Sequence, residues 1–168
     1  MNYWIENTRE SLLKTLSKID LLIINDSEAR RLANELNILQ AARKILNLGP
    51  RILVIKRGEY GALMFSPKSV FSVPGLPMEE VLDPTGAGDS FAGGLMGYLA
   101  ASGLSDDSAM RKAVVFGSVM ASFNVMDFGP QRLGSLTYPE IESRYREFHR
   151  ISSFEDIPRS PFKEEGNP

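Results

Sequence analysis

The stretch that decides the fold is Asp83–Phe91, which reads Asp-Pro-Thr-Gly-Ala-Gly-Asp-Ser-Phe. It follows a strand-like segment and leads into a predicted helix that runs from Gly86 to about Ala101. The small residues 86–88 leave their backbone N–H groups bare at the start of this helix, where the helix dipole also favours negative charge. The sequence therefore predicts an anion cradle, formed by residues 86–88, with Asp89 in the first helical turn placed as a general base beside it.

The same loop also has a purely structural interpretation. Asp89 is then a first-turn acid that stabilises the helix dipole, and the glycines form a tight turn. Two commoner phosphate loops are excluded, because no Gly-Lys-Ser/Thr follows and the Rossmann Gly-x-Gly-x-x-Gly spacing does not start here. Gly93, Gly94 and Gly97 each cost roughly 1 kcal/mol relative to Ala inside a helix, so we expect another element or a ligand to approach the backbone there.

Hydrophobic patterning around this stretch predicts an α/β fold with a partly parallel sheet. Apolar runs at residues 21–24 and 51–56 are typical of strands buried on both faces. The glycine-rich turn that follows predicts that residues 62–65 and 70–73 return as an antiparallel meander at the edge of the sheet. Helices are predicted at about residues 7–18 (capped by Asn7 or Thr8), 29–36, 41–48, 86–101, 106–125 and 138–148.

Composition removes several classes of function. The chain has 168 residues, 43% of them hydrophobic, with no cysteine and a single histidine, His149, so Cys/His zinc sites and Cys or His nucleophiles lack their parts. The 19 Lys and Arg against 21 Asp and Glu leave no basic excess for nucleic acid. No apolar run approaches a membrane span and the start carries no signal-peptide pattern, so we expect a cytoplasmic protein with neither nucleic-acid nor membrane partners.

Residues 83–94 closely resemble the C-terminal signature of the ribokinase-like (PfkB) carbohydrate and nucleoside kinases. Asn25-Asp26-Ser27-Glu28 is similar to the Asn-x-x-Glu of that family, and Lys56–Gly61 resembles its strand-turn beside the nucleotide. The resemblance covers about residues 19–135. It implies the C-terminal part of a three-layer α/β/α fold, with residues 1–149 as the nucleotide-binding and catalytic half and residues 150–168 as an irregular C-terminal tail.

The resemblance also implies an activity, which is ATP-dependent phosphoryl transfer to a hydroxyl of a sugar, nucleoside or similar small molecule. Asp89 would be the general base, and the amides of Gly86, Ala87 and Gly88 would be the anion hole for the transferring phosphoryl group. Asn25 and Glu28 would organise magnesium through water. These three roles, of base, anion hole and magnesium site, suit phosphoryl transfer, where catalysis is mainly positioning and charge stabilisation.

Further residues are assigned to the nucleotide and to a cation by the same resemblance. A monovalent cation would face Asp83 and Thr85, whereas the nucleotide would lie near Lys56, Gly58, Gly61, Gly117, Ser118, Asn124 and Gly129. Each assignment has a structural alternative: Asn25 and Glu28 as a helix cap, Lys56 as a surface lysine, Asp83 as a turn former and the small residues of the 106–125 helix as a helix-helix contact.

The chain departs from the family in length, since members generally run to about twice its size. Their N-terminal half supplies the lid and most groups that hold the acceptor. We therefore expect the isolated chain to be weak or inactive, and we expect an exposed sheet edge that favours self-association into a homo-oligomer. The alternative is a non-catalytic nucleotide-binding or interaction fragment of a kinase fold; a Rossmann-type dinucleotide protein is disfavoured by the glycine spacing.

Overall fold

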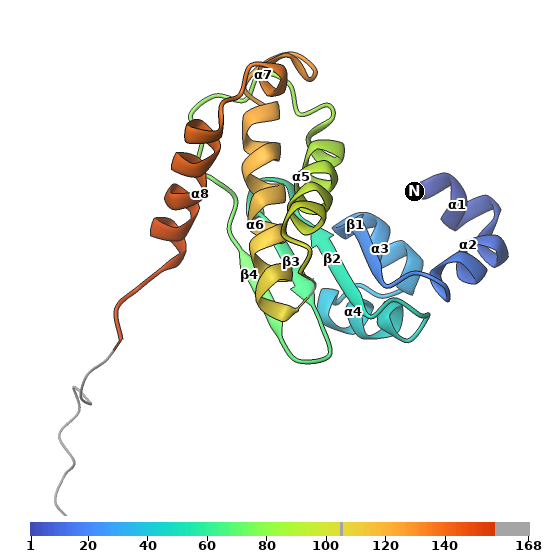
Figure 1. Ribbon diagram of the computed structural model, residues 1–168. Coiled ribbons are helices and arrows are strands. Elements are labelled where there is room, and N and C mark those ends of the chain that lie inside the picture. The colour runs from blue at the N-terminus through green and yellow to red at the C-terminus, as the bar shows by residue number, and fades with distance from the viewer. Residues whose placement is uncertain (105, 157–168) are drawn as a thin grey trace, which may run out of the picture.

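The sheet has four strands that lie in chain order in the computed structural model, which describes residues 1–104 and 106–156. They are β1 (Leu21–Asn25), β2 (Ile52–Lys56), β3 (Ala62–Phe65) and β4 (Val70–Val73). β1 and β2 are parallel, whereas β3 and β4 are antiparallel additions (Figure 1). The predicted parallel pair and edge meander are both confirmed.

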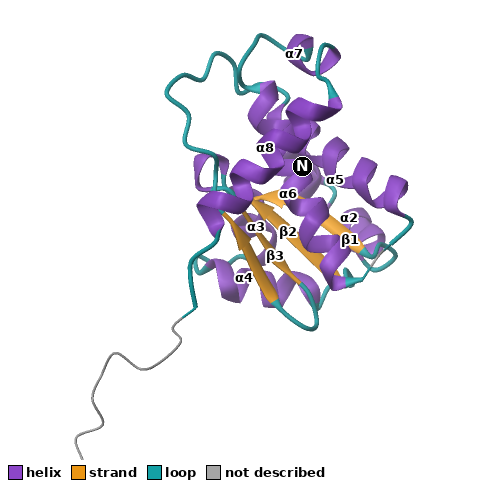
Figure 2. Cartoon of the chain, turned by 60° about the vertical axis from the view of Figure 1, so that its left-hand side comes forward, coloured by secondary structure: helices purple, strands orange, loops and turns teal. Residues whose placement is uncertain are grey.

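Helices cover both faces of this sheet (Figure 2). On one face, alternate strand residues such as Leu22, Ile24 and Leu53 form a core with α1 (Asn2–Asn7), α2 (Arg9–Leu16), α3 (Asp26–Ala33) and α4 (Ile38–Leu46). On the other face, residues such as Val54 and Met64 pack with α5 (Ala87–Ser102), α6 (Asp107–Asn124) and α8 (Tyr138–Ser152). The 3₁₀ turn η1 (Gly58–Tyr60) and the short α7 (Gln131–Gly134) complete the elements. The three-layer α/β/α arrangement is confirmed.

The first predicted helix, at about residues 7–18, forms as the shorter α2, and a separate helix, α1, precedes it that the pattern did not predict. The chain forms two helices that meet at Thr8, whose φ of −137° and ψ of 43° break the helix there and allow both Ile5 and Leu12 to reach the core. Of the two predicted cap residues, Thr8 occupies the N-cap of α2, but its hydroxyl makes no capping hydrogen bond and is buried without a hydrogen-bond partner in the described part of the chain. The Asn7 side-chain amide instead donates to the Tyr3 carbonyl.

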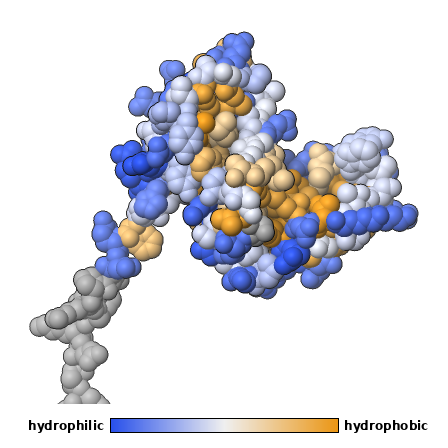
Figure 3. All heavy atoms as spheres, viewed as in Figure 1, coloured by the Kyte–Doolittle hydropathy of each residue, from blue (hydrophilic) through white to orange (hydrophobic). Residues whose placement is uncertain are grey.

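Strand β1 is buried less completely than its apolar run predicts. Leu22 and Ile24 are buried, but Leu21 and Ile23 on the opposite face are only half-buried, because β1 is an edge strand. Figure 3 shows hydrophobic side chains gathered at the surface over β1, between α5 and the α1–α2 arm. An exposed edge is therefore present, and the predicted self-association through it stays a prediction.

The segment before Asp83 is not the expected strand. Residues 74–86 contain no strand, and Leu82 is held by one backbone hydrogen bond, in which its amide donates to the Val125 carbonyl at 2.9 Å. The loop is thus attached to the end of α6, whereas a strand would have been attached to the sheet.

Helix α8 begins at a strongly hydrogen-bonded carboxylate. Glu140 accepts from both the Thr137 hydroxyl and the Thr137 amide and pairs with Arg132. The Thr137 hydroxyl, followed by Arg132 and the Thr137 amide, lowers the pKa of Glu140 to about 2. α8 continues to Ser152, past its predicted end and into the predicted tail, of which residues 157–168 lie outside the described residues. Among the described helices, none is both long and apolar enough to cross a membrane.

Candidate active site

Three separate parts of the sequence meet where the parallel strands end. Asn25 and Lys56 are register partners at the carboxyl ends of β1 and β2. A Cβ atom added to Gly88 would overlap the Lys56 ammonium, so the start of α5 lies against the end of β2. Ligands of α/β sheets bind at this edge, and the predicted catalytic loop, the Asn-x-x-Glu segment and the lysine are therefore brought together at one site.

The anion cradle has the backbone that a helix start requires. Gly86 caps α5 in the left-handed region with φ +82°, and its carbonyl accepts the Ser90 amide at 2.8 Å. The Ala87 amide donates to the Pro84 carbonyl at 3.2 Å, which engages one of the three predicted anion-hole donors within the turn. Over residues 1–104 and 106–156, the amides of Gly86 and Gly88 donate no backbone hydrogen bond.

Asp89 lies in the first turn of α5, three residues after the capping glycine. Its side chain is exposed and takes part in none of the ion pairs within the described ranges. An exposed carboxylate without an ion-pair partner among the described residues, next to bare helix-terminal amides, has the accessibility that a general base needs. Its catalytic role stays a prediction.

Asn124 joins the loop to the helix that follows it. Its amide nitrogen donates to the Thr85 carbonyl at 2.8 Å, and its amide oxygen accepts the Ser90 hydroxyl at 2.8 Å. The side chain is only 1% exposed, at the last position of α6. The sequence placed Asn124 near the nucleotide. The structure shows that it bridges Thr85 and Ser90, and the one signal for this in the sequence was a polar residue at the end of an apolar helix.

Asp83 is held in a turn with the residues around it. Its carboxylate accepts the Thr85 amide at 2.9 Å. Hydrogen bonds from the Thr85 side chain, the Thr85 amide and the Gly129 amide lower the pKa of Asp83. The structure brings together the two residues expected to face a monovalent cation, and places Gly129 beside them.

Asn25 and Glu28 form a capping box at the start of α3. The Asn25 side chain accepts the Glu28 amide at 2.8 Å, and the Glu28 carboxylate accepts the Asn25 amide at 3.0 Å. The second carboxylate oxygen lies 3.0 Å from the Met1 amino group. The helix-cap interpretation is confirmed, and it fixes both oxygen donors at the same edge as Lys56.

The glycines of the turn after β2 allow close packing of the chain as well as close approach of a ligand to the backbone. Gly58 has φ +57° and faces open space. Gly61 has φ +84°, and a Cβ atom there would overlap the Val73 carbonyl, so glycine is required by the chain itself. Gly75 meets the Glu59 carbonyl in the same way. Sequence reasoning missed Gly75, because its partner lies on another strand-turn.

Helices α5 and α6 approach closely at two glycines. A Cβ atom on Gly94 would lie 2.6 Å from the Met120 Cγ, and one on Gly117 would lie 2.8 Å from the Phe91 carbonyl oxygen. Gly93 and Gly97 meet nothing in the described part of the chain, so the expected close approach holds for Gly94 alone among the three. The small residues of α6 thus include a helix-helix contact. The Ser118 hydroxyl donates to the Val114 carbonyl, and the predicted adenine contact of Ser118 stays a prediction.

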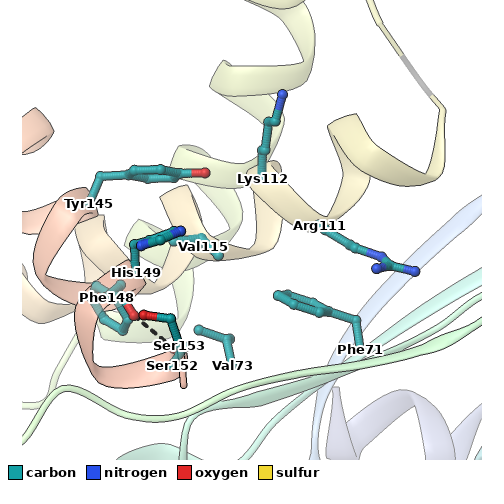
Figure 4. Close-up of a pocket in the computed structure, with 10 residues that line it drawn as sticks. All are labelled: Phe71, Val73, Arg111, Lys112, Val115, Tyr145, Phe148, His149, Ser152 and Ser153. Carbon is teal, nitrogen blue, oxygen red and sulfur yellow. Dashed lines mark hydrogen bonds between the residues drawn. The ribbon is translucent and has the colours of Figure 1, made fainter. Parts of the chain in front are cut away.

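A cavity of about 230 Å³ lies elsewhere, between β4, α6 and α8 (Figure 4). Its wall includes the apolar side chains of Phe71, Val73 and Phe148, with His149 at its border. None of the predicted site residues lines this cavity. The candidate active site is therefore the open edge at β1, β2 and α5, where the chemistry-bearing residues converge.

Comparison with known proteins places this geometry in a family. Residues 2–135 match the pfkB family of carbohydrate kinases, and the chain belongs to that family. It is 39% identical over 93 residues to the cytidine kinase of Thermococcus kodakarensis, a match that covers 54% of this chain and 33% of the relative. It is 32% identical over 139 residues to the deoxyribokinase of Salmonella typhi, covering 80% of this chain and 42% of the relative.

A solved structure supports the same assignment. An E. coli protein described as a ribokinase II, in complex with ATP and Mg²⁺, superposes with a TM-score of 0.70 at 28% identity, covering 86% of this chain and 45% of that chain. The fold is therefore the ribokinase fold. The chain spans about a third to under half of the length of these proteins.

Proposed function

We propose that this chain carries the nucleotide-binding and catalytic part of an ATP-dependent kinase that phosphorylates a hydroxyl of a sugar or nucleoside. The observation that carries the proposal is an exposed Asp89 carboxylate in the first turn of α5, beside the bare amides of Gly86 and Gly88. Relatives named cytidine kinase and deoxyribokinase support an acceptor from either class.

The proposed reaction is a single displacement. The acceptor hydroxyl gives its proton to the Asp89 carboxylate while its oxygen forms a bond to the terminal phosphorus of ATP, and the bond from that phosphorus to the bridging oxygen of ADP breaks. The cradle amides and the α5 dipole stabilise the charge on the transferred phosphoryl oxygens. Asn124 holds the cradle in place through Thr85 and Ser90.

The residues at the edge of the sheet fit magnesium. Magnesium prefers oxygen donors and keeps several waters, and it is commonly bound by one or two carboxylates together with substrate phosphates. Asn25 and Glu28 present an amide oxygen and a carboxylate at the end of β1. Because these oxygens already accept the Glu28 and Asn25 amides and face the Met1 amino group, the two residues would organise magnesium through its bound waters. Bound there, magnesium would neutralise phosphate charge. A monovalent cation would face Asp83 and Thr85, which the structure holds together in one turn.

The proposal is tested by measuring ADP formation by the purified chain with magnesium ATP and ribose, deoxyribose or cytidine. We expect weak or undetectable turnover without an acceptor-binding half, together with an unfolding midpoint that rises on addition of magnesium ATP. Any turnover should vanish in Asp89→Asn while ATP affinity stays nearly unchanged.

The same experiment separates the two functions that the sequence allows. An unfolding midpoint that ignores magnesium ATP would contradict a nucleotide site altogether. Nucleotide binding without turnover, both in this chain and in a longer chain that includes an acceptor half, would instead favour the non-catalytic fragment. Equal losses of turnover and ATP affinity in Asp89→Asn would contradict the base assignment.

A further inference from the structure

Lys56 occupies an unusual position for a lysine at the end of a buried strand. Its stem leaves β2 half-buried, and its ammonium lies so close to Gly88 that any Cβ atom there would overlap it. The neighbouring Arg57 is directed elsewhere, with its guanidinium 5.8 Å from the centroid of the Tyr60 ring. The cation against the cradle is therefore Lys56.

The charges around this ammonium are not balanced by the chain. None of the ion pairs in the described part of the chain includes Lys56, although Asp89 lies one residue beyond Gly88. The Lys56 ammonium thus lies against Gly88 at the positive end of α5, where the Gly86 and Gly88 amides donate no backbone hydrogen bond within the described residues. Such a concentration of positive potential is stabilised by an anion bound between its members.

We propose that Lys56 is a further catalytic residue, whose ammonium contacts the terminal phosphoryl group of ATP and so selects the triphosphate over the diphosphate. The inference rests on the proposed kinase function. It places the terminal phosphoryl at Gly88 because Asp89, the next residue, must reach the hydroxyl that attacks that same phosphorus. A lysine suits the role, since its compact charge with three donors can follow the phosphoryl group during transfer.

Glycine at position 88 leaves the backbone amide of the cradle accessible, and it also leaves space for the Lys56 ammonium. Its φ is not in the left-handed region and its nearest neighbour is the far end of a flexible side chain, so alanine fits there once the ammonium moves away. Gly88→Ala therefore displaces the Lys56 ammonium without straining the fold. The two substitutions Gly88→Ala and Lys56→Met remove the same contact from opposite sides.

The test measures dissociation constants for magnesium ATP and magnesium ADP on the purified chain. Because hydrogen bonds between charged groups are the strong ones, we expect Lys56→Met to weaken ATP binding roughly 10- to 100-fold. ADP binding should change by no more than about threefold, since ADP lacks the contacted group. Gly88→Ala should reproduce this loss, and the double variant should lose no more than either single variant.

Controls keep the outcomes distinct. Lys68→Met, in the β3–β4 turn at the opposite end of the sheet, should leave both constants unchanged, and circular dichroism should show that each variant is folded. Equal losses for ATP and ADP, additive losses in the double variant, or no loss in Lys56→Met would overturn the role of Lys56 while leaving the kinase proposal intact. A wild-type chain that binds neither nucleotide would overturn both.

Discussion

The bridge made by Asn124 can be measured as a coupling energy between two side chains. Ser90→Ala removes one hydrogen bond and leaves the Asn124 oxygen without its donor, which should cost about 1–2 kcal/mol of unfolding free energy. Asn124→Ala removes both bonds of a side chain that is 1% exposed. We expect a loss of about 2–3 kcal/mol, limited because the exposed Thr85 can turn its carbonyl to water.

The decisive quantity is the coupling energy, which is the difference between the free energy of unfolding lost in the double variant and the sum of the losses in the two single variants. Because both substitutions delete the Ser90–Asn124 hydrogen bond, the double variant should be about 1 kcal/mol more stable than the sum of the single losses predicts. Urea unfolding followed by far-UV circular dichroism gives all four free energies, provided that the urea dependence is unchanged. Asn47→Ala, at an exposed helix end, is the matched control and should change stability by less than about 0.5 kcal/mol.

A coupling energy near zero would refute the reasoning. It would mean that the loop keeps its position without the bridge, and that Asn124 is buried for packing alone. A measured coupling with unchanged magnesium ATP affinity in Asn124→Ala would keep the bridge but separate it from nucleotide binding.

Four other substitutions test the packing and the electrostatics. Gly94→Ala, which forces a Cβ atom against Met120, should destabilise the chain by about 1–3 kcal/mol, whereas Gly93→Ala in open space should stabilise it by up to about 1 kcal/mol; equal effects in urea unfolding would contradict the α5–α6 contact. Thr8→Val removes a buried hydroxyl without a partner in the described residues and should raise the thermal midpoint by about 2–4 °C; a lower midpoint in calorimetry would show that the hydroxyl is satisfied. Since the pKa of Glu140 is lowered from 4.5 to about 2 on folding, its carboxylate stabilises the chain above pH 4.5 and this contribution is lost as the pH falls toward 2. Glu140→Gln should therefore flatten the dependence of the thermal midpoint on pH over that range, and a parallel curve would exclude Glu140 as its source.

Local sequence pattern was sufficient for most of the framework. The apolar runs of β1 and β2 and the glycine-rich turn before β3 are short-range signals, and each strand formed where it was expected. The break at Thr8 could not be predicted in this way, because it depends on Ile5 and Leu12 meeting the same core. The half-burial of Ile23 depends on which elements flank β1, and its apolar character does not report that.

The candidate site likewise has features that the local sequence predicts and contacts that it does not. Residues 83–89 and the Asn-x-x-Glu segment can each be recognised from a few consecutive residues of the sequence, and the structure brings both to one edge of the sheet. The contacts between Lys56 and Gly88, and between Asn124 and Thr85, join segments that are far apart in the chain. A count of glycines likewise cannot distinguish Gly94, which faces α6, from Gly93, which does not.

Helix α6 is attached at both of its ends. At its C-terminus Asn124 is hydrogen-bonded to Thr85 and Ser90, and at its N-terminus Asp107 accepts hydrogen bonds from Ser66 and Ser69 in the β3–β4 turn. Its 18 residues span about 27 Å, and it packs closely against α5 at Gly94 and Gly117. Because α6 connects these two contacts, we expect a shift of the loop at Thr85 on nucleotide binding to be transmitted along the helix. It should then change amide hydrogen exchange in the β3–β4 turn, at the opposite end of the sheet.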